Sequence, residues 1–423
     1  MAALGVFVGV VALPAGSMAN AAKQPRTLTV SPADNLTNQV VEVSWAGFKP
    51  TKRSGVPTVT VMQCVAHPAN IATGCYTAAT FPNSDNGNQV NGAITAKDGT
   101  GHASIEVRPR FDLPQLGCTD SNPCSIVAFE DDGTPWPASG LPLTAASAQV
   151  GFEKTAKDCP PVSTFDFQSE GEASATATVS RWAANVCTAT PRDIVSYTES
   201  SSNRARNDVI RGLVDVGFTS LPATTAELAT APPNTKFVYA PIDATAAVVA
   251  YQMQDGNTLE QINDLAITPR LFARLITGSD VPQWDGDGDF TQLNPTAHAY
   301  PFKHAAFPLL RGDDNADTWL VTNWLGADPR TKAFLAGNDP GNPKITVDSY
   351  WKNYKYPVTA FQNLDHVLFD GGYQTLLNSA DVAHHLYYSA PAVASTPDTG
   401  YEYVGVLDLP TALRYRLPMF KLT

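Results

Sequence analysis

Three polar loops in this sequence carry side chains that could bind an anion. They span residues 169–174, 198–203 and 311–318, and each precedes a segment that we predict to be helical. The first turn of a helix presents free backbone N–H groups and a partial positive charge, and serine hydroxyls or a guanidinium add further donors. We therefore predict a site for a small polar or anionic ligand. Its predicted residues are Ser169, Gly171, Ser200, Ser201, Ser202, Ser220, Arg311, Asp313 and Asn315.

Two of these groups also have purely structural interpretations, which the sequence leaves open. Arg311 either clamps an anion or pairs with Asp313 or Asp314. The serines at 200–202 either donate to a ligand or cap the helix that follows them. If Arg311 does clamp an anion, replacing it with alanine should abolish any stabilisation of the protein by that anion.

Alternating strands and helices must position the three loops. This alternation predicts an α/β domain over residues 165–423, with a parallel sheet and with ligands bound where loops leave the carboxyl ends of the strands. We predict a turn over 169–172. The predicted strands cover 165–168, 194–197, 214–218, 237–240 and 246–251, and the predicted helices cover 173–186, 203–212, 269–277 and 318–325.

The N-terminal part of the chain has a different pattern. Residues 26–152 consist of short apolar/polar alternations separated by polar turn clusters, which predicts an all-β sandwich. Residues 153–164 contain Pro160 and Pro161 and are predicted to be a linker. The predicted strands of the sandwich include 27–30, 40–45, 58–62 and 103–107.

The six cysteines indicate disulfide bonds, which are typical of exported proteins. They occur as three close pairs, and pairing in sequence order is the simplest arrangement. Each bridge would stabilise the fold by about 2–4 kcal/mol, mainly by restricting the unfolded chain. The predicted pairs are Cys64 with Cys75, Cys118 with Cys124, and Cys159 with Cys187.

The beginning of the chain predicts export as well. Residues 1–22 carry no charged side chain, and an apolar run over 2–13 is followed by the small residues 19–21. This pattern predicts a signal peptide, although its positive n-region is missing. The alternative is an uncleaved anchor, for which the apolar run is short. We therefore predict a secreted or cell-surface protein.

Length and charge limit the remaining function classes. A chain of 423 residues with 43% hydrophobic and 16% charged residues is expected to form two or three globular domains. Its formal net charge of -12 opposes binding to nucleic acid or anionic lipid. We predict no nucleic-acid partner and no membrane insertion of the mature chain, and any anion site must be built from local donors.

In the C-terminal part, the loops and the segments between them resemble the phosphate-type solute-binding proteins. Residues 197–202 stand where that family has its second serine-rich loop, 214–220 resembles its strand ending in a serine, and 311–313 its Arg-x-Asp. The order of these pieces is shared over roughly 165–420. The resemblance implies a type II periplasmic-binding-protein fold of two lobes, with a phosphate-like ligand in the cleft between them.

The same loops depart from that family at four places. Residues 315–317 read Asn-Ala-Asp where the family has Ser-Gly-Thr, and Leu221 replaces the aspartate that would accept from a protonated phosphate oxygen. Glu170 and Glu172 lie in the first loop. Each carboxylate near a dianion costs about 1 kcal/mol or more at an effective dielectric of about 20. The identity of the ligand therefore stays open.

The predicted sandwich resembles the neocarzinostatin-like immunoglobulin fold. The resemblance is carried by residues 28–32, 40–47 and 59–64 and by the first two cysteine pairs, which form one medium and one very short loop. In that family's antibiotic carriers the sandwich holds an enediyne chromophore. Because a fold alone does not define a function, we favour a spacer or adhesion role for this domain over chromophore carriage.

Other motifs indicate no catalysis, metal or cofactor. Residues 285–289 alternate Asp and Gly but lack the glycine and carboxylate positions of an EF-hand, so we predict a solvated acidic turn. His384 and His385 have no further ligand nearby in sequence. Three hypotheses remain, none of them enzymatic: a solute-binding protein, a structural or adhesive surface protein with a wall or surface partner on a degenerate solute-binding scaffold, and a chromophore carrier.

Overall fold

The computed structural model of this protein is described over residues 25–52, 55–76, 89–108, 123–153, 159, 166–189, 193–253, 261–279, 286–296, 306–361, 374–376, 379–388 and 402–423. The predicted signal peptide and most of the predicted linker lie outside these ranges. Among the described helices, none has the length and apolar character needed to cross a membrane.

The N-terminal part forms two antiparallel sheets that enclose one apolar core, as the alternating pattern predicts. One sheet has the order β1 (Thr27–Ser31), β2 (Gln39–Ala46), β5 (Gly101–Val107). The other has the order β4 (Gln89–Ala93), β3 (Thr58–Val65), β6 (Cys124–Asp131), β7 (Ala146–Val150), with the short helix α1 (Ile71–Gly74) beside it. The four predicted strands are confirmed. The resemblance to the neocarzinostatin family stays a prediction.

Two of the predicted disulfides are present. Cys64 is bonded to Cys75 within the sandwich, and Cys159 is bonded to Cys187. Cys124 is also disulfide-bonded, while its predicted partner Cys118 lies outside the described residues. Disulfides persist in oxidising compartments, which agrees with export.

A small parallel sheet begins the α/β part, which we call the first lobe (residues 166–230). Its strand order is β10 (Val216–Phe218), β8 (Phe167–Gly171), β9 (Val195–Glu199). Helices α2 (Ala173–Thr188), α3 (Ser202–Ile210) and α4 (Thr225–Leu228) accompany it. The turn predicted over 169–172 is wrong, because Ser169 to Gly171 continue the strand and Glu172 is the N-cap of α2.

The second lobe (residues 247–423) is built on a mixed sheet with the order β11 (Ala247–Gln252), β15 (Glu402–Asp408), β13 (Ala306–Arg311), β14 (Gln374–Leu376). β12 (Ala266–Ile267) and β16 (Lys421–Leu422) form a separate parallel pair. The helices are α5 (Pro269–Ile276), α6 (Gly288–Leu293), α7 (Ala316–Ala327), α8 (Pro329–Leu335), α9 (Ser379–Tyr388) and α10 (Leu409–Arg414). The strand predicted over 237–240 is not formed, because those residues join no ladder.

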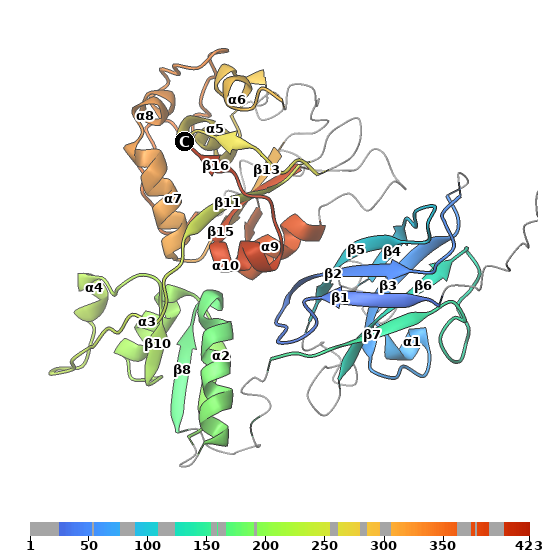
Figure 1. Cartoon of the computed structure of the whole chain (residues 1–423). Coiled ribbons are helices and arrows are strands. Elements are labelled where there is room, and N and C mark those ends of the chain that lie inside the picture. The colour runs from blue at the N-terminus through green and yellow to red at the C-terminus, as the bar shows by residue number, and fades with distance from the viewer. Residues whose placement is uncertain are drawn as a thin grey trace, which may run out of the picture.

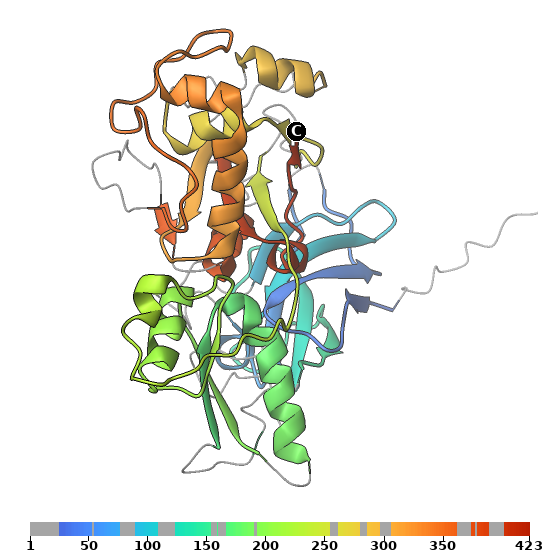
Figure 2. The ribbon, with the colours of Figure 1, turned by 90° about the vertical axis from the view of Figure 1, so that its left-hand side faces the viewer.

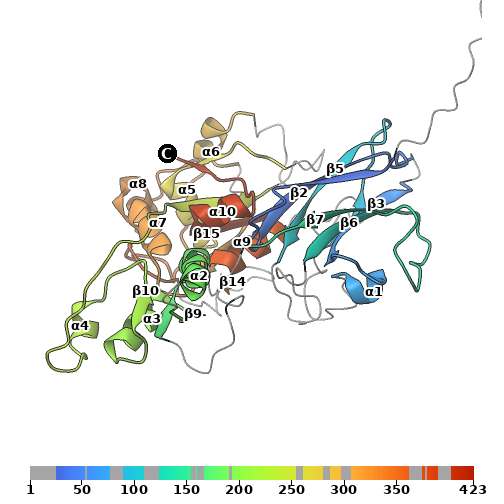
Figure 3. The ribbon, with the colours of Figure 1, turned by 60° about the horizontal axis from the view of Figure 1, so that its bottom comes forward.

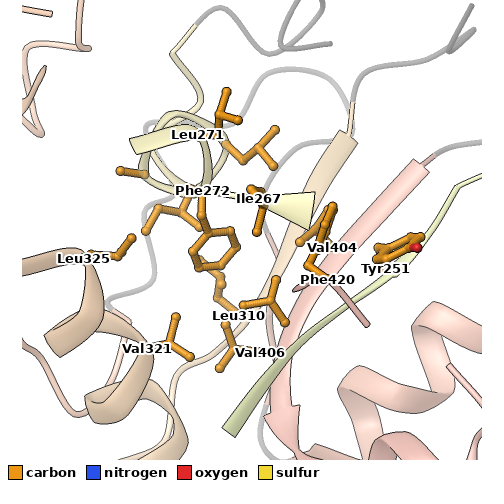
Figure 4. Close-up of a cluster of buried hydrophobic side chains, with 14 of the residues drawn as sticks. Tyr251, Ile267, Leu271, Phe272, Leu310, Val321, Leu325, Val404, Val406 and Phe420 are labelled. Carbon is orange, nitrogen blue, oxygen red and sulfur yellow. The ribbon is translucent and has the colours of Figure 1, made fainter. Parts of the chain in front are cut away.

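The core of the second lobe lies between the mixed sheet and helices α5 and α7 (Figure 4). Leu310, Val404 and Val406 point from the strands toward Phe272 of α5, and Val321 of α7 closes the cluster from below. These side chains are fully or almost fully buried. Burying each such side chain contributes on the order of 1.5–3 kcal/mol, so this core fixes where β13 ends and α7 begins.

The lobes meet at the carboxyl ends of their strands. Figure 1 shows the first lobe, in green, below the second lobe, in yellow to red, with the sandwich in blue on the side of α9 and α10. The quarter turn in Figure 2 keeps α7 above α3. β13 and β15 run parallel and end at Arg311 and Asp408, while β8 ends at Gly171. Open α/β folds place their polar sites at such ends.

Candidate functional site

A buried carboxylate, Glu172, lies at the centre of the interlobe contact. It is 2% exposed at the junction of β8 and α2. Its Oε1 accepts hydrogen bonds from the Ser202 hydroxyl, from the Ser220 backbone N–H at 3.0 Å and from the Ser220 hydroxyl at 2.5 Å. Two residues predicted to donate to an anion therefore donate to a carboxylate of the same chain.

Arg311 is paired with two neighbouring aspartates. It is 1% exposed, and its Nε and Nη2 donate to Asp313 at 2.8 and 2.5 Å, while its Nη1 donates to Asp317 at 2.9 Å. Of the partners considered from the sequence, Asp313 is the one that Arg311 contacts. Asp314 instead accepts from Arg206 at 2.7 Å.

Two polar contacts join the lobes directly. The backbone N–H of Ala316, in the first turn of α7, donates to the Ser220 hydroxyl at 2.9 Å. Arg206 of α3 reaches Asp314 of the second lobe and also pairs with Glu227 at 3.0 Å. Because Ser220 contacts both Glu172 and α7, the first-lobe site is closed by the second lobe.

Two predicted site residues act as helix caps. Ser201 caps α3 by accepting from the Arg204 N–H at 3.3 Å, and the Ser200 hydroxyl donates to the Ser201 carbonyl at 3.2 Å. Asn315 caps α7, its Oδ1 accepting from the Thr318 N–H at 2.8 Å. The capping interpretation of the serines therefore holds for Ser201 in this structure.

Two further predicted residues lie in the first-lobe sheet. The Ser169 hydroxyl donates to the Ser196 carbonyl at 2.5 Å, which ties β8 to β9. A Cβ on Gly171 would stand 2.4 Å from the Phe218 carbonyl oxygen, so glycine lets β8 and β10 approach. The structure thus gathers Ser202, Ser220, Arg311, Asp313 and Asn315 at the interlobe contact and places Ser169 within the sheet.

The site carries an excess of negative charge. Burial, together with the nearby carboxylates of Asp408, Glu172 and Asp313, raises the pKa of Asp317 to about 7 against the lowering effect of Arg311. Asp408 is 1% exposed and caps α10, and its Oδ2 finds no hydrogen-bond partner among the described residues. Asp313, Asp317 and Glu172 thus act on one guanidinium, Arg311, while Asp408 acts on Asp317, and a further anion would be repelled.

Sequence reasoning missed the role of two of these residues. We expected Glu172 to repel a bound anion, whereas in the structure it accepts from donors predicted for that anion. Asp408 was not a predicted site residue. A signal for Asp408 exists in the sequence, where Asp-Leu-Pro-Thr reads as an N-cap followed by proline at a helix start. No comparable signal identifies Glu172 as an acceptor, because its donors come from segments 30 and 48 residues away.

The acidic motif at 285–289 is not the solvated turn that we predicted. Asp287 is fully buried, caps α6, and accepts from Arg270 at 2.8 Å and Arg274 at 3.1 Å. Arg270 also pairs with Asp339 at 2.5 Å. Asp285 lies outside the described residues. Within the described part of the chain, no three histidine, cysteine or acidic side chains form a group suited to a metal ion.

Comparisons with known proteins give a distant likeness among solved structures. No family model matches the chain, and no curated protein matches it. Among solved structures, it is similar to PstS from Borrelia burgdorferi over 61% of this chain and 76% of that chain, with 10% sequence identity and a TM-score of 0.27.

Proposed function

We propose that this chain is a secreted or cell-surface structural protein whose two lobes form a closed scaffold around an internal carboxylate. The observation that supports this proposal is the position of Glu172, which takes the hydroxyl and amide donors of Ser202 and Ser220. On this proposal the fold is related to solute-binding proteins, but its anion site is filled by the protein.

The charges around Glu172 favour the scaffold over anion capture. A free anion would have to displace Glu172 from Ser220 and then face Asp313 and Asp317, which already occupy Arg311. Glu172 is held by the same chain, so it competes at a high effective concentration without losing the freedom of a separate molecule. Displacement would also leave a buried carboxylate without its donors, which is costly.

We also propose a surface location and a partner role for this chain. Two disulfides support export, and the antiparallel sandwich has the architecture of many surface modules. We propose that the sandwich contacts a wall or surface partner while the lobes give it a rigid base. Chromophore carriage stays an untested alternative.

Glu172→Ala is expected to convert the closed scaffold into an anion-binding protein. The substitution frees the Ser202 and Ser220 donors and removes one negative charge. Added phosphate or sulfate should leave the melting temperature of the wild type unchanged and raise that of the variant. Anion at about 100 times its dissociation constant stabilises by about 2.7 kcal/mol. Differential scanning fluorimetry across an anion titration measures both responses.

Two further variants serve as comparisons for Glu172→Ala in this titration. Glu172→Gln keeps the shape of the side chain and is expected to give a weaker response, since the amide still fills the site. Glu199→Ala removes an exposed glutamate of the same lobe and should behave as wild type. A phosphate-dependent shift in the wild type would contradict the scaffold proposal, and a Glu172→Ala variant that ignores every anion would show that these donors form no anion site.

A further inference from the structure

We propose that the N-terminal β-sandwich acts as a clamp that holds the two lobes closed, and that the Cys159–Cys187 disulfide keeps the clamp in place. The inference rests on the proposed closed scaffold and concerns what maintains closure. It follows from the contacts that the sandwich makes with each lobe and from the way in which the chain connects the lobes.

The sandwich contacts the second lobe through a buried carboxylate. Glu106 of β5 is 1% exposed and accepts from the Tyr415 hydroxyl at 2.7 Å, next to α10. It also contacts His384 Nδ1 of α9 at 3.1 Å and Arg108 of the sandwich at 3.2 Å. A buried carboxylate must keep such partners, because removing one leaves an uncompensated charge. This cluster therefore fixes β5 against α9 and α10.

Apolar and peripheral contacts extend the same interface. Val40 of β2 is buried in a cluster whose other members come from the second lobe, among them Leu309 and Leu407. Arg416 pairs with Glu42 at 2.7 Å and donates to the Ser31 carbonyl at 3.1 Å. Figure 3 shows one end of the sheet that contains β2 lying beside α9. The sandwich is thus packed against the second lobe and not merely linked to it.

The chain that follows the sandwich is attached to the first lobe, and this attachment forms the other end of the clamp. Glu153, just after the sandwich, pairs with Arg181 of α2 at 2.5 Å. Six residues further on, Cys159 is bonded to Cys187 near the end of α2. At up to about 3.6 Å per residue, the six-residue segment keeps Glu153 within about 20 Å of Cys159, and the disulfide attaches Cys159 to Cys187 of the first lobe. Without the disulfide, the chain from Glu153 to the first-lobe strand at Phe167 could span about 50 Å.

The direct connection between the lobes adds little rigidity. Residues 229–246 run from α4 to β11 outside any helix or strand, and 238–246 are exposed throughout, with Val238 at 92%. A segment with so few packed side chains opens at low free-energy cost. Closure is therefore expected to depend on the polar contacts of Ser220 and Arg206 together with the sandwich that spans both lobes.

Hydrogen–deuterium exchange of the full-length protein tests the clamp. The reporters are the N–H of Ala316, which bonds Ser220 across the lobes, and the N–H of Ser220, which bonds Glu172. Glu106→Gln combined with Cys159→Ser and Cys187→Ser should speed exchange in peptides containing Ser220 and Ala316 by at least about tenfold. Glu130→Gln, whose partners Arg26 and Lys49 both belong to the sandwich, is the matched control and should leave these rates unchanged.

A milder variant covers the case in which the triple variant does not fold. Tyr415→Phe removes only the hydroxyl that donates to Glu106 and should give a smaller acceleration in the same peptides. The clamp is overturned if peptides over 101–107 and 409–417 exchange faster while those of Ser220 and Ala316 keep their wild-type rates. That result would leave the role of Glu172 intact, whereas phosphate binding by the wild type would refute the closed scaffold regardless of these rates.

Discussion

Replacing Gly341 with alanine is expected to lower the free energy of unfolding of the second lobe by about 3–5 kcal/mol. A Cβ at this position would stand 1.6 Å from Nη2 and 2.1 Å from Cζ of Arg270. Arg270 is almost fully buried and cannot turn away, because it is bonded to Asp339 at 2.5 and 2.7 Å and to Asp287 at 2.8 Å. The methyl group must therefore separate a buried guanidinium from its carboxylates.

Thermal unfolding followed by calorimetry measures this effect. Gly286→Ala is the matched control, because a Cβ there meets no atom within 4 Å although the residue borders the same cluster. The control should stay within about 0.5 kcal/mol of the wild type. If Gly341→Ala unfolds at the wild-type temperature, Arg270 has room to move, and the ion-pair cluster contributes less to stability than its burial implies.

The Arg270 cluster shows where sequence reasoning reached its limit. The alternating Asp and Gly residues of 285–289 looked like a solvated turn because acidic residues are rarely buried without partners. The partners of Asp287 are Arg270 and Arg274, and Asp339 joins them from a distant loop. Periodicity within a segment carries no information about pairs so far apart in sequence.

The positions of the strands and helices were easier to predict from the sequence than the contacts between them. Strand and helix positions such as β2, α2 and α5 followed from local alternation, turn residues and the proline after Thr268, which caps α5. The strand predicted over 237–240 failed because a strand also needs a neighbour, and residues 237–240 have none in a described sheet. Local propensity thus indicates extended backbone without deciding whether a ladder forms.

For the site as well, the sequence predicted which residues lie together but not which groups they contact. Ser202, Ser220 and Arg311 were predicted to share a site because their loops follow strand ends, and the structure brings them together from two different sheets. Their partners were undecided, because donors suited to an anion suit a carboxylate side chain equally well. In the structure, the group that accepts from both serines is the carboxylate of Glu172.

Asp317→Asn is expected to remove a pH dependence of stability from the second lobe. Burial and the neighbouring carboxylates raise the pKa of Asp317 from 3.8 to about 7 in the folded protein. The folded state therefore binds this proton more tightly, so the stabilisation is complete below the unfolded pKa and is lost as pH rises through 7. The loss amounts to roughly 4 kcal/mol between about pH 4 and pH 8.

The asparagine variant should keep the Arg311 contact through its side-chain oxygen and avoid the ionised form. We expect it to be more stable than wild type at pH 8, to exceed it by less at pH 5, and to match it only below about pH 4, where the aspartate is protonated in the unfolded state as well. Asp264→Asn changes an aspartate of the same lobe whose side chain is 78% exposed, and should retain the wild-type profile. Urea unfolding at several pH values gives the free energies directly. A wild-type stability that rises between pH 5 and pH 8 would contradict the raised pKa.

The pKa of Glu106 is shifted in the opposite direction, so this residue makes the stability fall on the acid side of the pH profile. Burial alone would raise its pKa, but the hydrogen bond from His384 and the charge of Arg108 hold the pKa at about 2 instead of 4.5. Its stabilisation is present above pH 4.5 and is lost as pH falls toward 2, by about 3 kcal/mol. The two carboxylates therefore predict maximal stability at mildly acidic pH. Asp317→Asn should flatten the alkaline side and leave the acid side unchanged, since Glu106 lies at a different interface.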